Sequence, residues 1–295
     1  MKDSAHPSPP AAAASPEVLA SGKDYRIEYH APPAAAAPAY EGRVLVGFGE
    51  IGSGLQSPGF AQKIAADLGI AYIAVKQRHK TQYQFLSREI FQEAVAPWSA
   101  SHELYLYGTS LGGYCAAYYA RPVAAHFLAL SPRIPAHPVT SRRLPIRFTS
   151  PGFLHEDIYD GGVPDVSSRK VVLLDPQNRV DRFYVDTDLA VAFDDLEIHH
   201  VMHAGHYVPR ALLLSGCLKQ TLTAFLRDET INLRIDTAAV LQWHEERFGL
   251  LVDQRRFGHA IEHLEVLLPE VSADRQAELI RTLNTAMRRA AARTS

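Results

Sequence analysis

The stretch ELYLYGTSLGGYCAAYYA, residues 103–120, decides the fold, because an apolar run, a glycine-rich turn and a helical run follow one another directly. The short apolar run ELYLY is typical of a buried strand. The turn that follows has the spacing Gly108-x-Ser110-x-Gly112. A sharp strand-to-helix turn of this kind pushes a serine hydroxyl out of the sheet, and its glycines leave room where Cβ atoms would collide. The stretch therefore predicts a nucleophilic serine at position 110.

The same alternation of strand and helix runs through most of the chain. Apolar runs of strand length recur at residues 25–30, 43–48, 71–76, 103–108, 126–131, 170–175 and 196–202. Helical spacing of apolar residues appears at 60–68, at 85–95 and in a longer segment near 207–228. Strands that alternate with helices indicate an α/β fold with a mostly parallel, doubly wound sheet.

Composition divides the chain into three parts. Residues 1–22 are rich in Pro, Ala and Ser and are expected to be a disordered lead. Residues 23–230 hold the α/β domain, and 131–169, which has many prolines and weak periodicity, is expected to be an insertion. Residues 231–295 show only helical patterns, so we expect a helical C-terminal appendage.

The C-terminal helices have recognisable start signals and apolar faces. Asp253 and Ser272 each precede a helical pattern and are the expected N-caps. The apolar faces favour packing on the main domain, and they are also the expected surface for a protein partner or for self-association.

Bulk properties narrow the class of protein. A formal net charge of −2 gives no electrostatic reason to expect nucleic acid as a partner. No run reaches the roughly 18 apolar residues of a membrane span, and the chain start lacks the apolar segment of a secretory signal, so a cytoplasmic protein is expected. Cys115 and Cys217 lie in apolar stretches and are interpreted as reduced core residues. No His and carboxylate cluster has metalloenzyme spacing, so no metal and no cofactor is expected.

A serine hydroxyl reacts only when a base takes its proton and an acid orients that base. His206 follows Gly205 at the start of a helical run, where a loop histidine can reach Ser110, and it is the expected base. Three other histidines compete for this role inside or just after a strand-like run: His199, His200 and His203.

The acid has two candidates. Asp175 ends the strand KVVLLD, which is where the chain order serine, acid, histidine places it, and it is favoured. Asp181 is the alternative, because the intervening PQNRV can turn the chain back toward the histidine. Without that turn, Asp181 is simply an acidic residue that favours a helix N-terminus.

The segments VGFG, GTSLGGY, VVLLDP and AGHYVP, in this order, resemble the α/β-hydrolase superfamily over about residues 25–228. The stretches GTSLGGYCAAYYA and GHYVPRALLLSGCL resemble, more loosely, α/β-hydrolase-like proteins associated with bacterial surface polysaccharides. The superfamily resemblance implies a serine hydrolase fold. One position departs from it, since Val46 stands where family loops often have histidine.

The glycine-rich segment VGFGEIGSG, residues 46–54, allows two interpretations. Its G-x-G-x-x-G spacing is that of a dinucleotide-binding loop, but no helix pattern begins directly after Gly52, as such a loop requires. An NADP-binding protein therefore stays an alternative, since Lys76 and Arg78 follow the next strand. We favour an oxyanion loop, in which a backbone N–H of Phe48 or Gly49 joins that of Leu111.

Basic residues follow two of the expected strands. Lys76, Arg78 and Lys80 come after one strand, and Arg133, Arg142, Arg143 and Arg147 lie in the expected insertion. Because ligands of such sheets bind beyond the carboxyl ends of the strands, four of these residues are candidate substrate-binding cations: Lys76, Arg78, Arg142 and Arg143.

The expected function is that of a serine hydrolase or esterase. A Ser-His-Asp triad would form an acyl-enzyme on a small-molecule or saccharide ester, carbohydrate-linked if the polysaccharide resemblance holds. An O-acyltransferase that uses the same triad to modify polysaccharide is the alternative. A non-catalytic scaffold with this fold is the alternative of another class, because a fold alone does not establish chemistry.

Overall fold

The computed structural model describes residues 15–33, 40–144, 152–156, 158 and 168–292. Within them one eight-stranded sheet has the order β1-β2-β4-β3-β5-β6-β7-β8. The strands are β1 (Glu17–Ser21), β2 (Tyr25–His30), β3 (Arg43–Phe48), β4 (Ala71–Gln77), β5 (Glu103–Thr109), β6 (His126–Leu130), β7 (Lys170–Leu174) and β8 (Glu197–His200).

Neighbouring strands from β4 to β8 are parallel, whereas β2 is antiparallel to both β1 and β4. This arrangement confirms the predicted mostly parallel, doubly wound sheet. All the predicted strands are present, because short apolar runs covered on both faces are a strong strand signal.

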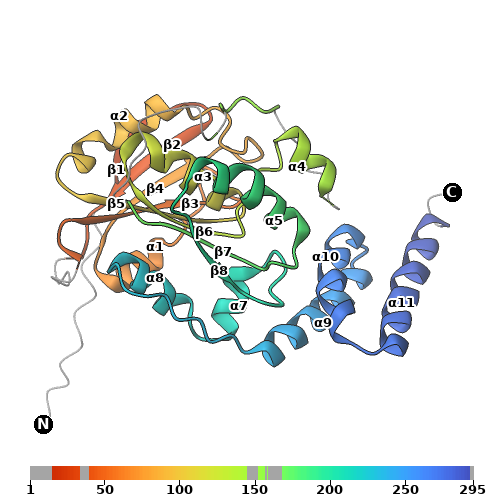
Figure 1. The fold of residues 1–295 in the computed structure, drawn as a ribbon. Helices are drawn as coiled ribbons and strands as arrows, with labels where there is room; N and C mark the ends of the chain where they lie inside the picture. The colour runs from red at the N-terminus through yellow and green to blue at the C-terminus, as the bar shows by residue number, and fades with distance from the viewer. Residues whose placement is uncertain (1–14, 34–39, 145–151, 157, 159–167, 293–295) are drawn as a thin grey trace, which may run out of the picture.

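Helices cover both faces of the sheet (Figure 1). Helices α2, α3 and α5 contribute to the apolar cluster on one face, and α1, α7 and α8 contribute to the cluster on the other. Their bounds are α1 (Gln62–Leu68), α2 (Arg88–Ser99), α3 (Leu111–Ala120), α4 (Pro138–Arg143), α5 (Arg179–Tyr184), α6 (Ala190–Ala192), α7 (Val208–Leu214) and α8 (Leu218–Leu226). Short helical turns cover Arg121–Val123, Val185–Leu189 and Leu268–Glu270.

Two segments differ from the sequence-based expectation. Strand β1 lies inside the segment 1–22 that was expected to be disordered, where it pairs along one edge with β2. Its side chains are half-buried or exposed, and its apolar run is only the three residues Val18–Ala20, which is too short to predict a strand. The helix expected near 207–228 is two helices, because Gly216 adopts φ 68° and ends the first of them.

Part of the expected insertion 131–169 lies outside the described residues, namely 145–151, 157 and 159–167. Its described part contains α4. The two cysteines are buried and not joined by a disulfide. Among the described residues, no helix is long and apolar enough to cross a membrane.

The predicted C-terminal helices are present as α9 (Thr237–Asp253), α10 (Phe257–Leu267) and α11 (Ala273–Ala291). Ser272 caps α11, as predicted, by accepting a hydrogen bond from the Arg275 N–H. The prediction for Asp253 was wrong: it is the last residue of α9, whose N-cap is Asp236.

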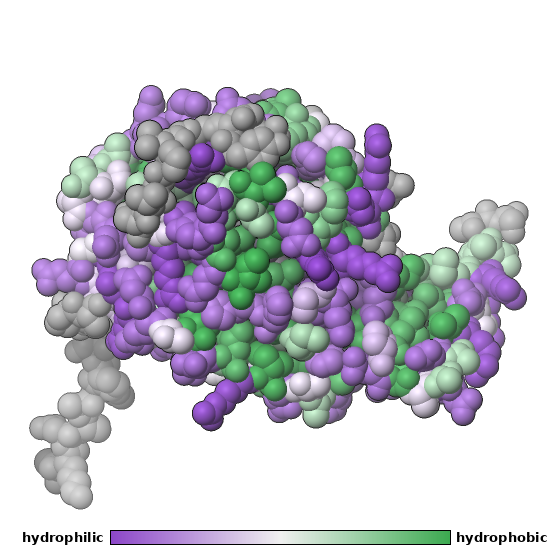
Figure 2. Space-filling model, viewed as in Figure 1, coloured by the Kyte–Doolittle hydropathy of each residue, from purple (hydrophilic) through white to green (hydrophobic). Residues whose placement is uncertain are grey.

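The C-terminal helices are attached to the sheet and also have a core of their own. Val240 of α9 is fully buried in the apolar cluster on one sheet face. Farther along, residues of α9, α10 and α11 form a separate apolar cluster. On the right of Figure 2, hydrophobic residues also reach the surface of this part, and Leu250, Ile280 and Met287 are each more than one third exposed. An assembly role for this surface stays a prediction.

Candidate functional site

Ser110 stands at the turn between β5 and α3, in a backbone conformation that few residues adopt. Its φ is 53° and its ψ is −120°, and its N–H donates to the Leu130 carbonyl oxygen at the end of β6 (2.9 Å). A positive φ at a residue with a Cβ is strained, and such strain is concentrated at functional sites. The local geometry is the sharp strand-to-helix turn that the sequence predicts.

Close backbone contacts explain the glycines on either side of Ser110. A Cβ on Gly108 would lie 2.2 Å from the Gly112 carbonyl carbon and oxygen. A Cβ on Gly112 would lie 2.2 Å from the Phe48 carbonyl oxygen. These positions therefore let α3 start directly against β5 and β3.

Replacing Gly112 with Ala is expected to lower the free energy of unfolding by about 3 kcal/mol or more, at the upper end of overpacking costs, because the clash is with backbone. The measurement is urea unfolding. Gly249→Ala in α9 is the matched control, since nothing lies within 4 Å of its Cβ position. There alanine is expected to stabilise the protein by up to about 1 kcal/mol. Equal unfolding free energies for the two variants would contradict the packing argument.

The expected base, His206, lies within hydrogen-bonding distance of Ser110. Its Nε2 is 2.9 Å from Ser110 Oγ. The competing histidines lie elsewhere: His199 and His200 are in the edge strand β8, and His203 Nδ1 faces Glu270 at 3.4 Å. Of the four histidines considered, the structure brings only His206 to the serine.

The preference for Asp175 as the partner of His206 does not match the hydrogen bonds. Asp181 Oδ2 lies 2.7 Å from His206 Nδ1, and the Asp181 side chain is fully buried. The Asp175 carboxylate instead accepts from the backbone N–H groups of Gln177 (2.9 Å) and Gly205 (2.8 Å).

A turn after β7 explains why Asp181, rather than Asp175, faces His206. The Asn178 N–H donates to the Asp175 carbonyl oxygen, and the Asn178 side chain then caps α5. Asp181 thus lies in the first turn of α5, facing His206. Asp175 holds the loop that carries His206, and burial raises the pKa of its carboxyl group above the usual range.

The three backbone groups expected at an oxyanion site are placed differently. Leu111 is the first residue of α3, where N–H groups have no acceptor within the helix. The Gly49 N–H, by contrast, donates to Tyr83 Oη (2.8 Å), and Phe48 lies within β3, paired on both sides. The Leu111 N–H therefore has no acceptor within its helix, whereas the Gly49 N–H already donates to Tyr83.

The candidate substrate-binding cations do not form one cluster of free charges. Lys76 Nζ lies 2.7 Å from Glu28 Oε2, and Arg78 is paired with Asp24. Arg142 and Arg143 are exposed on α4, and the Arg143 guanidinium lies over the Phe183 ring at 3.8 Å. Arg147 falls outside the described residues. Substrate binding by these residues stays a prediction.

Arg133 is the basic residue that the structure brings to the site. Its side chain is only 4% exposed, and its Nε donates to His206 Nε2 at 2.9 Å. Its Nη2 donates to Oε1 of Glu262, on α10, at 3.0 Å. Tyr207 Oη donates to the other oxygen of that carboxylate at 3.0 Å. An ion pair thus connects the histidine to the C-terminal helices.

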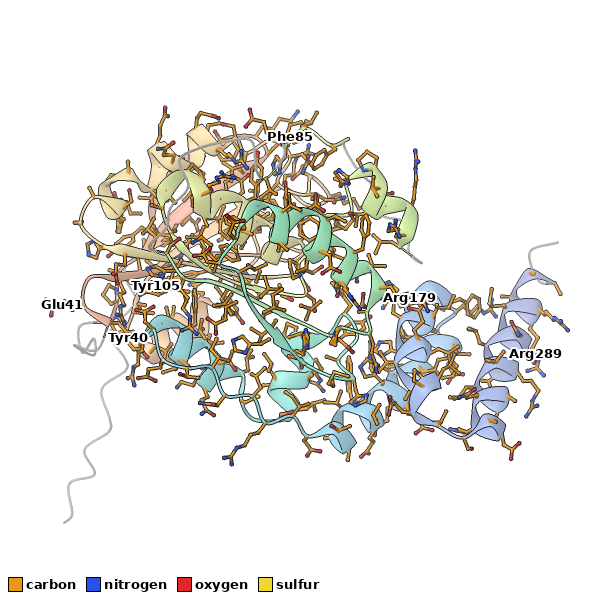
Figure 3. The ribbon with its side chains drawn as sticks, in the orientation of Figure 1. Tyr40, Glu41, Phe85, Tyr105, Arg179 and Arg289 are labelled. Carbon is orange, nitrogen blue, oxygen red and sulfur yellow. The ribbon has the colours of Figure 1, made fainter. Side chains whose placement is uncertain are left out.

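The loop that carries His206 packs directly against α10. A Cβ on Gly205, whose φ is 55°, would lie 2.7 Å from Val266 Cγ2. The rings of Tyr207 and His263 stack at 4.6 Å between centroids. The positive charge of Arg179, on α5, favours the ionised form of Glu265, on α10. Figure 3 shows Arg179 beside the C-terminal helices. The helices predicted as an appendage therefore border the candidate site.

Few local sequence signals predict these contacts. Tyr207 adjoins His206, but nothing local distinguishes Glu262 from other helical carboxylates, since it is 129 residues from Arg133. Tyr83 adopts a positive φ of 58° and reaches Gly49 from a turn after β4. Such partners are fixed by tertiary packing rather than by local pattern.

The glycine-rich segment after β3 does not lead directly into a helix. Gly47 lies within β3, and α1 begins at Gln62, ten residues after Gly52. A dinucleotide-binding loop needs a helix N-terminus directly behind its glycines to face the pyrophosphate. The described geometry here lacks that feature.

A scan against protein-family models and a search of curated proteins found no match for this sequence. Among solved structures, the chain is similar to an α/β serine hydrolase without lid from Xanthomonas campestris at 15% identity, covering 76% of this chain and 98% of that one, with a TM-score of 0.47. It is also similar to Est1E from Butyrivibrio proteoclasticus, solved with ferulic acid, at 11% identity, with coverages of 72% and 96% and a TM-score of 0.45. For Thermogutta terrifontis esterase 2, phosphoramylated by tabun, the identity is 16%, the coverages are 66% and 84%, and the TM-score is 0.41.

Proposed function

We propose that the chain is a serine hydrolase of the esterase type with an α/β-hydrolase fold, with Ser110 as nucleophile, His206 as base and Asp181 as the orienting acid. The observation that carries this proposal is the continuous chain of hydrogen-bonding distances, 2.9 Å from Ser110 Oγ to His206 Nε2 and 2.7 Å from His206 Nδ1 to Asp181 Oδ2. Such a chain activates a serine hydroxyl.

In the proposed reaction, Ser110 Oγ attacks the ester carbonyl carbon while His206 Nε2 takes the hydroxyl proton. The Leu111 N–H donates to the carbonyl oxygen as it becomes negatively charged. His206 then gives its proton to the leaving alcohol, and an acyl-enzyme remains. Water, activated by the same histidine, releases the acid and restores Ser110.

Covalent labelling with a fluorophosphonate tests the proposal. The unmodified protein is expected to be labelled at one serine, because phosphonylation needs an activated hydroxyl. Ser110→Ala should abolish the label, and Ser99→Ala, at an exposed helix position, should leave it unchanged. Full labelling of the Ser110→Ala variant would refute the assignment, and an inert unmodified protein would favour a non-catalytic scaffold.

The substrate, the acyltransferase alternative, the polysaccharide association and the cytoplasmic location stay predictions. An assay with p-nitrophenyl acetate and added sugar separates hydrolysis from transfer, because a transferase positions a hydroxyl so that it outcompetes water. Acetylated sugar as the main product would favour the transferase, and free acetate would favour the hydrolase.

A further inference from the structure

The Nε2 atom of His206 has two hydrogen-bond donors, and only one of them belongs to the proposed triad. Ser110 Oγ and Arg133 Nε both lie 2.9 Å from it. A guanidinium donates hydrogen bonds and cannot accept them. Nε2 must therefore present its lone pair to Arg133, which leaves the imidazole proton on Nδ1, facing Asp181.

The same contact opposes the protonated form of the imidazole. If Nε2 takes the Ser110 proton, its new N–H faces the Arg133 Nε–H, and two positive charges lie in contact. Like charges at this range disfavour the charged form of a titrating group. Because Arg133 is buried, little solvent screens this repulsion.

Two carboxylates offset the charge of Arg133: Asp181 Oδ1 lies 3.6 Å from Arg133 Nε, and Glu262 Oε1 lies 3.0 Å from Arg133 Nη2. Burial acts to raise the pKa of the Glu262 carboxyl group, but the hydrogen bond from His259, the charges of Arg133 and His206 and the bond from Tyr207 lower it to about 2. Glu262 is therefore ionised at neutral pH. It reaches the cluster only because α10 packs on the loop that carries His206.

Other ionisable groups face this cluster from the surrounding elements. They are Asp181 of α5, Asp175 after β7, Tyr207 before α7, His203 in the loop after β8, Arg247 of α9, Arg179 of α5, and His259, His263 and Glu265 of α10. Of the cationic groups among them, none is hydrogen-bonded to His206 in the described residues, whereas Arg133 is.

We propose that Arg133 and Glu262 are a positioning pair for His206: Arg133 holds the imidazole as the tautomer with its proton on Nδ1 and opposes protonation of Nε2, and Glu262, supplied by the C-terminal helices, weakens that opposition by offsetting the charge of Arg133. This proposal rests on the proposed function, in which His206 is the base. It makes α10 part of the catalytic machinery without contact with the reacting atoms.

The test is the titration of the His206 ring nitrogens by NMR in protein labelled with ¹⁵N-histidine, with His206→Gln to assign the signals. Glu262→Gln removes an opposite charge from beside the imidazolium, so the midpoint should move to lower pH. Adding Arg133→Met then removes a like charge, so the double variant should titrate at higher pH than Glu262→Gln. Each shift is expected to be on the order of one pH unit.

Neither variant leaves a buried carboxylate without a partner: position 262 is then an uncharged amide, and Asp181, which loses its 3.6 Å contact with Arg133 in the double variant, keeps its hydrogen bond with His206. Both variants are therefore expected to fold. Glu265→Gln, at an exposed position of the same helix, is the matched control and should shift the midpoint least. The acid limb of kcat/KM should follow the same directions. The proposal would be contradicted if both substitutions moved the His206 titration midpoint in the same direction. It would also be contradicted if neither moved the midpoint more than Glu265→Gln does.

The two proposals fail separately. A protein that resists fluorophosphonate would defeat the proposed function, while the NMR titration would still report whether the pair acts on His206. Normal labelling with unmoved titration midpoints would defeat the pair and leave the proposed function intact.

Discussion

Replacing Ser110 with Ala is expected to lower kcat for ester hydrolysis by about a millionfold, because the acyl-enzyme can no longer form. His206→Ala should cost a similar factor, since a serine hydroxyl without its base is a poor nucleophile. The double variant should be no slower than either single variant, because groups that act as one unit are not additive.

Single-turnover kinetics with p-nitrophenyl acetate gives the measurement, and circular dichroism provides the control for folding. Ser110 has a positive φ, so Ala at this position keeps the same backbone strain and should leave the fold unchanged. Losses of kcat that multiply in the double variant would show that the two residues act independently, which contradicts the proposed mechanism.

Asp181→Asn should lower kcat by about 10⁴, the cost expected when the histidine loses the carboxylate that fixes its tautomer and stabilises its charged form. The amide N–H of the substituted side chain would donate to His206 Nδ1 and so favour the tautomer with its proton on Nε2. In that tautomer Nε2 cannot accept the Ser110 proton. The measurement is the same kinetic assay, with the melting temperature recorded in parallel.

Asp175→Asn is the matched control, since it alters the other buried carboxylate near the loop. Its two acceptor oxygens hold the N–H groups of Gln177 and Gly205, so the variant should lose stability by about 1–3 kcal/mol. Its kcat should stay within about tenfold of the unmodified value. The reverse pattern, with the large kinetic loss at Asp175, would restore the assignment favoured by chain order alone.

The sheet could be predicted from sequence because its inner strands are buried on both faces and read as uninterrupted apolar runs. The turn at Ser110 could be predicted because its backbone segments approach so closely that positions 108 and 112 must be glycine, and this requirement is visible as the Gly108-x-Ser110-x-Gly112 spacing. Strand β1 could not be predicted, because it pairs on one edge and buries little of its side chains.

The candidate site was predictable only as far as local pattern reaches. Chain order pointed to Ser110 and His206, which the structure brings together. Asp175 and Asp181 could not be separated by pattern, because a turn of six residues decides which carboxylate faces the histidine. Arg133 and Glu262 meet through packing between distant segments, for which the sequence carries no periodic signal.

The packing of α10 on the loop of His206 also orders events during synthesis of the chain. The strands and the segment up to His206 leave the ribosome first, but Glu262 and Val266 follow some sixty residues later. At about 5–20 residues per second this interval lasts several seconds. During it the nascent chain has Ser110 and His206 but not the helix that supports the histidine loop, so the candidate site is completed only after α10 has been translated.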